Sequence, residues 1–191
     1  DVYKRQIHGG CLRGSASAMS NYKLARRNVV RTILVVGEGY SEEYFLKHLI
    51  GLYVQRGCGF RFDVKNARGK GAAYVVNVAI RQSRNADFDH RVALLDTDVG
   101  WDQKTESTAR KERIQVLAST PCLEGLLLQI HKKPIKDRTT EQLKQAFEAA
   151  FAAPASEPSI YPRFFTKAIL EEARTTVATL QTLLTLLETG K

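Results

Sequence analysis

Short apolar runs alternate with amphipathic stretches along this chain, which is the pattern of β-strands that feed α-helices. Ile33–Val36 and Val92–Leu95 are continuous apolar runs, as expected of strands buried on both faces of a parallel sheet. We therefore predict an α/β fold with a compact, mostly parallel sheet of about four strands flanked by helices. The expected strands cover residues 33–36, 60–64, 91–95 and 113–118, and the helices between them 41–55, 72–84 and 104–112.

The rest of the chain has a helical pattern. We expect a helix over residues 141–152 and a loop at 154–158. Residues 164–188 carry an apolar stripe at coiled-coil spacing, which we interpret as core packing because two heptads are too few to indicate a dimer. The stripe consists of Val177, Leu180, Leu184 and Leu187.

The length of the chain favours one domain. We place it at residues 19–191, with a catalytic-like α/β core at 31–131 and a helical part at 132–191. Residues 1–18 show no apolar periodicity, and the only methionine of the chain is Met19. We expect residues 1–18 to be a non-native or disordered leader.

The composition narrows the class of partner. A net charge of +9 suggests a polyanion such as nucleic acid, although basic charge also serves solubility alone. The three cysteines have neither paired nor metal-ligand spacing, which fits a reducing cytosol and a cytoplasmic protein. Since no apolar run approaches the ~20 residues of a membrane span, we expect no membrane partner.

The junction after the first strand carries the first candidate for chemistry. Glu38 lies between two glycines at the carboxyl end of a predicted core strand, where open α/β sheets place their ligands. Ser41 is the expected N-cap of the following helix, and Glu42 falls in the first turn of that helix. The helix therefore explains Glu42 but not Glu38.

Asp96 and Asp98 follow the third expected strand. Residues at i and i+2 of an extended segment point the same way, so both carboxylates can converge with Glu38 on one cation. Oxygen-only ligands suit Mg²⁺ or Mn²⁺. The alternative is a simple turn, in which aspartate is favoured.

Glu124 falls in the first turn of a helix for which Thr120 is the expected N-cap and Pro121 a first-turn residue. An acid there serves the helix dipole, or it adds another carboxylate to the same sheet edge.

Two basic segments are candidates for phosphate contacts. Arg68 and Lys70 lie in a glycine-rich loop that opens a helix, without the spacing of a nucleotide-binding P-loop. Lys132 and Lys133 begin a second basic run. The alternatives are a flexible turn for the first segment and a solvated loop for the second.

Three segments of the chain resemble one known family. GEGYSEEYF, the DTD after a strand, and STPCLEGLLLQ resemble the RloB-like proteins, a branch of the Toprim-type domains that also includes nucleases of the overcoming-lysogenization-defect type. The resemblance covers roughly Arg31 to the end. The chain departs from the family pattern at Thr120, Leu123 and Gly125, where asparagine, phenylalanine and tryptophan are usual. The matching positions are Glu38, Gly39, Ser41, Glu42, Ser119, Pro121, Cys122, Glu124 and Leu127.

The resemblance implies a Toprim-like fold and metal-dependent phosphodiester chemistry. It assigns Glu38 as general acid or base, and Asp96 and Asp98 as holders of Mg²⁺, and it implies a role in phage defence or beside restriction systems. The resulting hypothesis is a Mg²⁺-dependent nuclease or related phosphoryl-transfer domain acting on DNA or RNA, in which Glu42 and Glu124 complete the metal-binding acids. The alternative is a non-catalytic module that binds nucleic acid, or docks a protein encoded nearby, in a defence complex.

Overall fold

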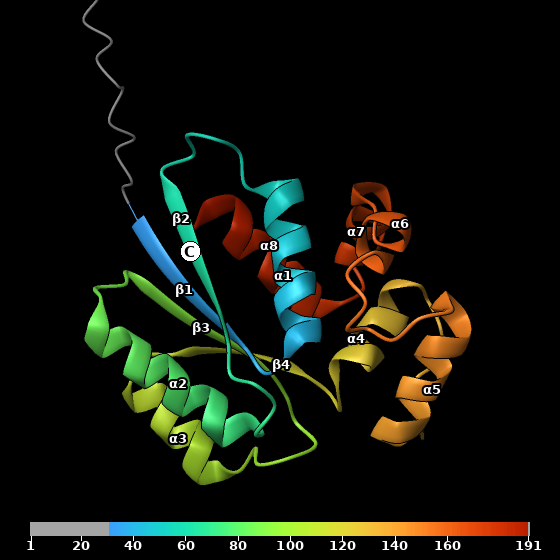
Figure 1. The fold of residues 1–191 in the computed structure, drawn as a ribbon, viewed down its shortest axis with the longest axis horizontal. Helices are drawn as coiled ribbons and strands as arrows, with labels where there is room; N and C mark the ends of the chain where they lie inside the picture. Colours follow the sequence, from blue (N-terminus) through green and yellow to red (C-terminus); the bar gives the residue numbers. More distant parts are fainter. Residues whose placement is uncertain (1–30, 191) are drawn as a thin grey trace, which may run out of the picture.

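The computed structural model describes residues 31–190. Their four strands form one all-parallel sheet in the order β2-β1-β3-β4 (Figure 1). The predicted α/β fold with a parallel sheet is therefore confirmed. The strands are β1 (Arg31–Gly37), β2 (Phe60–Asn66), β3 (His90–Asp96) and β4 (Gln115–Ser119).

Helices cover both faces of this sheet. Side chains of β1 and β3 alternate between two separate apolar clusters, because successive residues of a strand point to opposite faces. One cluster joins the sheet to α2 and α3, and the other joins it to the remaining helices (Figure 1). The first helices are α1 (Tyr40–Tyr53), α2 (Ala72–Asn85), α3 (Gln103–Lys111) and α4 (Leu123–Ile130).

The helical C-terminal part packs on the α1 side of the sheet. Its buried leucines belong to the same apolar cluster as the core of α1, so the two parts share one core. Val177, Leu180, Leu184 and Leu187 are all buried, which confirms core packing for this stripe. The helices are α5 (Thr140–Phe151), α6 (Ile160–Phe164), α7 (Lys167–Arg174) and α8 (Ala178–Thr189).

Three local predictions need correction. Gly39, not Ser41, is the N-cap of α1, because the Glu42 side chain binds the Gly39 amide. Cys122, not Thr120, is the N-cap of α4, so that helix begins two residues after Pro121. Residues 164–188 are not one helix, since the chain breaks between α7 and α8.

Two further expectations concern the ends of the chain and membranes. The predicted leader at residues 1–18 lies outside the described residues. Within residues 31–190, none of the helices has the length and apolar character that crossing a bilayer requires.

The strand order places a topological switch point beside the candidate acids. β1 and β3 are neighbours, yet the helix after β1 packs on one face of the sheet and the helix after β3 on the other. In open α/β sheets, ligands bind at this kind of switch point, outside the carboxyl ends of the strands. Glu38 directly follows β1 and Asp96 ends β3, so both lie at the switch point.

Candidate metal-binding and catalytic site

Glu38 is held between two segments of the sheet edge. Its Oε1 accepts a hydrogen bond from the Gly71 amide at 3.1 Å, and its Oε2 accepts one from the Asp96 amide at 3.3 Å. Burial raises the pKa of this carboxyl, and the two amide donors oppose the rise. The two amide donors therefore fix the Glu38 carboxylate in place between the Gly71 loop and the end of β3.

The buried side chain of Glu42 caps the start of α1. Its Oε2 accepts a hydrogen bond from the Gly39 amide at 2.7 Å, and the residue is only 5% exposed. Burial raises the pKa of Glu42 to about 7, and the charges of Glu124 and Glu38 add to the rise. Glu42 is thus the N3 residue of a capping box, and it is more buried than that role requires.

Asp96 is the most perturbed acid of the group. Burial raises its pKa to about 9, and the charges of Glu42, Glu38, Glu124 and Asp98 contribute in that order. Its Oδ1 is buried without any hydrogen-bond partner. A buried, unpaired carboxylate oxygen among other carboxylates is costly unless it is protonated or meets a cation.

Ser119 lies beside Asp96 and was not predicted as a site residue. The two residues pair in register across β3 and β4, and the Ser119 hydroxyl is also buried without a partner. The sequence carries one part of this signal, since Ser119 follows the predicted strand at 113–118, whereas its pairing with Asp96 is set by the order of the strands.

Asp98 and Glu124 come from two further segments, the loop after β3 and the first turn of α4. Asp98 lies past the end of β3 and is exposed, and its Oδ2 accepts a hydrogen bond from the Thr140 hydroxyl of α5 at 2.8 Å. Glu124 lies in the first turn of α4 beside Cys122. Burial, together with the charges of Glu124 and Asp96, raises the pKa of the Cys122 thiol to about 12. The five predicted acids thus come from the ends of β1, β3 and β4.

Lys144 of α5 brings a positive charge that the sequence did not point to. Its charge lowers the pKa of Glu38. It also shares with Ser41 and Glu124 a cavity of about 160 Å³. Lys144 lies in the helical part, 106 positions after Glu38 in the sequence. Its position near the acids therefore follows only from the packing of α5 against the α/β core.

The two basic segments are placed differently. The Gly69 amide donates to the Glu38 carbonyl at 2.7 Å, which ties the loop of exposed Arg68 and Lys70 to the acid edge. Lys132 and Lys133 follow the end of α4, about 12 Å along that helix from its start. There Lys132 forms an ion pair with Glu172. The structure brings the first segment to the acids and places the second at the far end of α4.

The donor set suits a hard divalent cation. Across residues 31–190, no group of three or more histidine, cysteine, aspartate or glutamate side chains is already arranged to hold a metal ion. Mg²⁺, however, keeps several waters and uses one or two protein carboxylates together with substrate phosphates. The unpaired Asp96 Oδ1, surrounded by other carboxylates, is an oxygen donor of this kind. The residues therefore fit Mg²⁺ or Mn²⁺.

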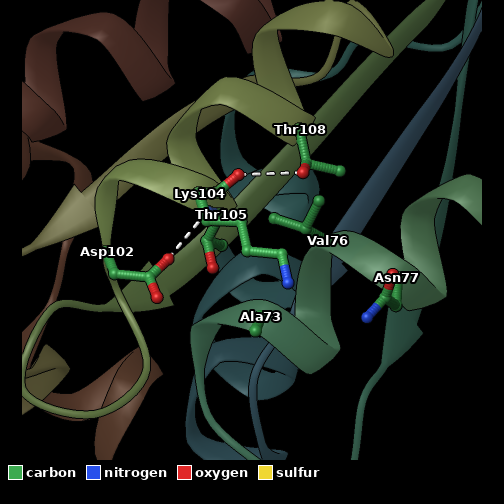
Figure 2. A pocket seen from close by; sticks show the side chains of 7 residues that line it. All are labelled: Ala73, Val76, Asn77, Asp102, Lys104, Thr105 and Thr108. Carbon is green, nitrogen blue, oxygen red and sulfur yellow. Dashed lines mark hydrogen bonds between the residues drawn. The ribbon is translucent and has the colours of Figure 1, made fainter.

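A separate cavity of about 320 Å³ lies between α2 and α3 (Figure 2). The Asp102 carboxylate accepts from the Thr105 amide at 2.7 Å, which caps α3, and the Lys104 side chain extends toward α2. The carboxylate of Asp102 is occupied in capping α3, and none of the five candidate acids lines the cavity. The cavity is therefore distinct from the acid edge.

Comparison with family models, with curated proteins and with solved structures finds no match to this chain.

Proposed function

We propose that this chain is a divalent-cation-dependent nuclease or related phosphoryl-transfer domain of RloB-like, Toprim type, acting on nucleic acid. One observation carries the proposal. At the switch point of the sheet, the buried and unpaired Asp96 Oδ1 lies among carboxylates whose charges, together with burial, raise the Asp96 pKa to about 9. A cation relieves that cost and also binds the phosphate of a substrate.

The cation, when bound, supplies activation of a water and neutralisation of charge on the scissile phosphate. Asp96 and Glu42 would hold it, with Asp98 and Glu124 at the edge of the site. Glu38 accepts the proton of the attacking water as the new phosphorus–oxygen bond forms. The phosphorus–oxygen bond to the leaving group breaks, and solvent protonates the leaving oxygen. Arg68 and Lys70 contact the flanking phosphates.

The partners and location belong to the same proposal. Nucleic acid is the substrate, and by the family resemblance a protein encoded nearby in a phage-defence or restriction-linked system is a second partner. A cytoplasmic location fits Cys58 and Cys122, which are both free thiols.

The test is cleavage of supercoiled plasmid and of single-stranded circles with Mg²⁺ or Mn²⁺. We expect cleavage that EDTA abolishes, and a loss of at least about 100-fold in Glu38→Ala and Asp96→Asn. Glu106→Gln is the matched control, because Glu106 is an exposed acid of α3 paired with Arg110. It should cleave like wild type.

Equal cleavage by wild type, Glu38→Ala and Asp96→Asn would falsify the proposal. Binding that survives EDTA and weakens with salt, without any cleavage, would instead identify a non-catalytic nucleic-acid-binding module.

A further inference from the structure

Tyr40 is an exposed aromatic ring at the acid edge. It is the first residue of α1, two positions after Glu38, and it is 56% exposed. Within residues 31–190, only one other large apolar side chain is comparably exposed, namely Val99 at 61%. Val99 directly follows Asp98. Both exposed apolar side chains therefore flank the candidate acids, one beside each of the two segments that the Glu38–Asp96 hydrogen bond brings together.

The Tyr40 ring rests on a second aromatic ring. Its centroid lies 6.1 Å from that of Tyr44, with an interplanar angle of 28°. Tyr44 is half-buried and packs against the main apolar cluster. Tyr40 is therefore supported from one side by a side chain anchored in the core, and this support leaves more than half of it open to solvent.

Positive charge lies on the neighbouring loop. The side-chain amide of Asn66 donates to the Glu43 carboxylate at 2.9 Å, so the start of this loop is fastened to the first turns of α1. Arg68 and Lys70 follow on the same loop and are exposed, and the Lys70 ammonium lies 5.1 Å from the centroid of the Tyr74 ring of α2. An aromatic platform together with exposed cations is the combination that proteins use to bind single-stranded nucleic acid, in which bases stack on rings and phosphates meet the cations.

Building on the proposed function, we propose that the site takes an unpaired nucleotide strand, with one base stacked on Tyr40 and the adjoining phosphates on Arg68 and Lys70. A paired base inside a duplex has both faces covered by its neighbours, so it cannot use this platform. Stacking is indifferent to base identity and to the sugar, because every base has an open π-face. Tyr40 thus selects for single-stranded over double-stranded nucleic acid rather than for a base sequence.

The test measures binding of the full chain to labelled 12-nucleotide strands by fluorescence anisotropy. The probes are oligo(dT), oligo(rU), an abasic strand of the same length and charge, and a blunt-ended duplex of two complementary strands, each in EDTA and again in Mg²⁺. We expect Tyr40→Ala to weaken binding of oligo(dT) and oligo(rU) about tenfold, the size of a lost base–aromatic stack. Binding of the abasic strand and the duplex should not change. Tyr40→Phe, which keeps the ring, is the matched control and should bind like wild type.

Two results overturn this inference. One is an equal loss by Tyr40→Ala on the abasic strand and on oligo(dT), since that loss does not depend on a base. The other is the absence of any Tyr40 effect on oligo(dT), including the case in which no probe binds. Failure of the proposed function gives a different result. Binding that depends on Tyr40 without any cleavage would contradict the proposed nuclease activity but support the stacking site. Cleavage with binding that does not depend on Tyr40 would contradict the stacking site alone.

Discussion

The backbone amide of Asp96 donates a hydrogen bond to the Glu38 carboxylate, with 3.3 Å between the Asp96 nitrogen and Glu38 Oε2. The two residues lie 58 positions apart in the chain. The bond exists because β1 and β3 are adjacent parallel strands whose carboxyl ends meet at one edge of the sheet. It places the proton-accepting candidate beside the buried acid and makes their interaction measurable.

The first prediction concerns pH. The pKa values of Asp96 and Glu42 are raised to about 9 and about 7, so the folded protein holds protons that the unfolded chain releases. This contribution to stability is fully present below about pH 4 and is lost as pH rises toward 9. In EDTA, the free energy of unfolding should therefore fall between pH 5 and pH 8.

Asp96→Asn isolates this effect. One pKa unit corresponds to about 1.4 kcal/mol, and the interval from pH 5 to pH 8 lies between the unfolded and the folded pKa of Asp96. The variant should therefore be more stable than wild type at pH 8, and this gain should be smaller at pH 5 by on the order of 4 kcal/mol. Urea unfolding at both pH values measures the difference, and a gain that does not depend on pH would contradict the raised pKa.

The second prediction concerns metal. At pH 8, millimolar Mg²⁺ or Mn²⁺ should raise the melting temperature of wild type by several degrees, because a ligand that binds only the folded state stabilises it. Asp96→Asn should lose most of this shift, and Glu106→Gln should keep it. Differential scanning fluorimetry with and without EDTA measures the shift, and the same shift in all three proteins would argue against a site at Asp96.

The third prediction concerns Gly37, where the backbone of β1 approaches α1. A Cβ added to Gly37 would lie 2.7 Å from Glu42 Cβ, closer than side-chain atoms pack. Gly37→Ala should therefore destabilise the protein by about 1–3 kcal/mol and shift the Glu42 cap.

Gly51→Ala is the control for this substitution. Gly51 lies inside α1 with no atom within 4 Å of an added Cβ, so alanine there should stabilise by about 0.5–1 kcal/mol. Thermal unfolding of both variants gives the comparison. A Gly37→Ala protein as stable as wild type would show that α1 can move away from β1.

Local pattern was sufficient for the four strands and for placing Glu38 and Asp96 at strand ends, but not for the division of residues 164–188 into separate helices. The continuous apolar runs before Glu38 and Asp96 indicate strands buried on both faces, and the residue that follows such a strand in a parallel sheet lies at its ligand-binding edge. The observed bounds of α2 and α3 lie within one or two residues of the predicted ones for the same reason, since the apolar period of a helix is encoded locally.

The sequence alone therefore determined the α/β class, the strands and the positions of Glu38 and Asp96 at strand ends. Only the tertiary structure decided that β1 and β3 are neighbours, that Glu42 is buried where the charge of Glu124 acts on it, and that the charge of Lys144 of α5 acts on Glu38. The physical reason is the range of the interactions. The periodic spacing of apolar side chains that defines a helix or strand depends on neighbours a few residues away, whereas strand order and helix docking depend on contacts between segments far apart in the sequence. For that reason the buried acids with raised pKa values can be recognised only in the folded chain.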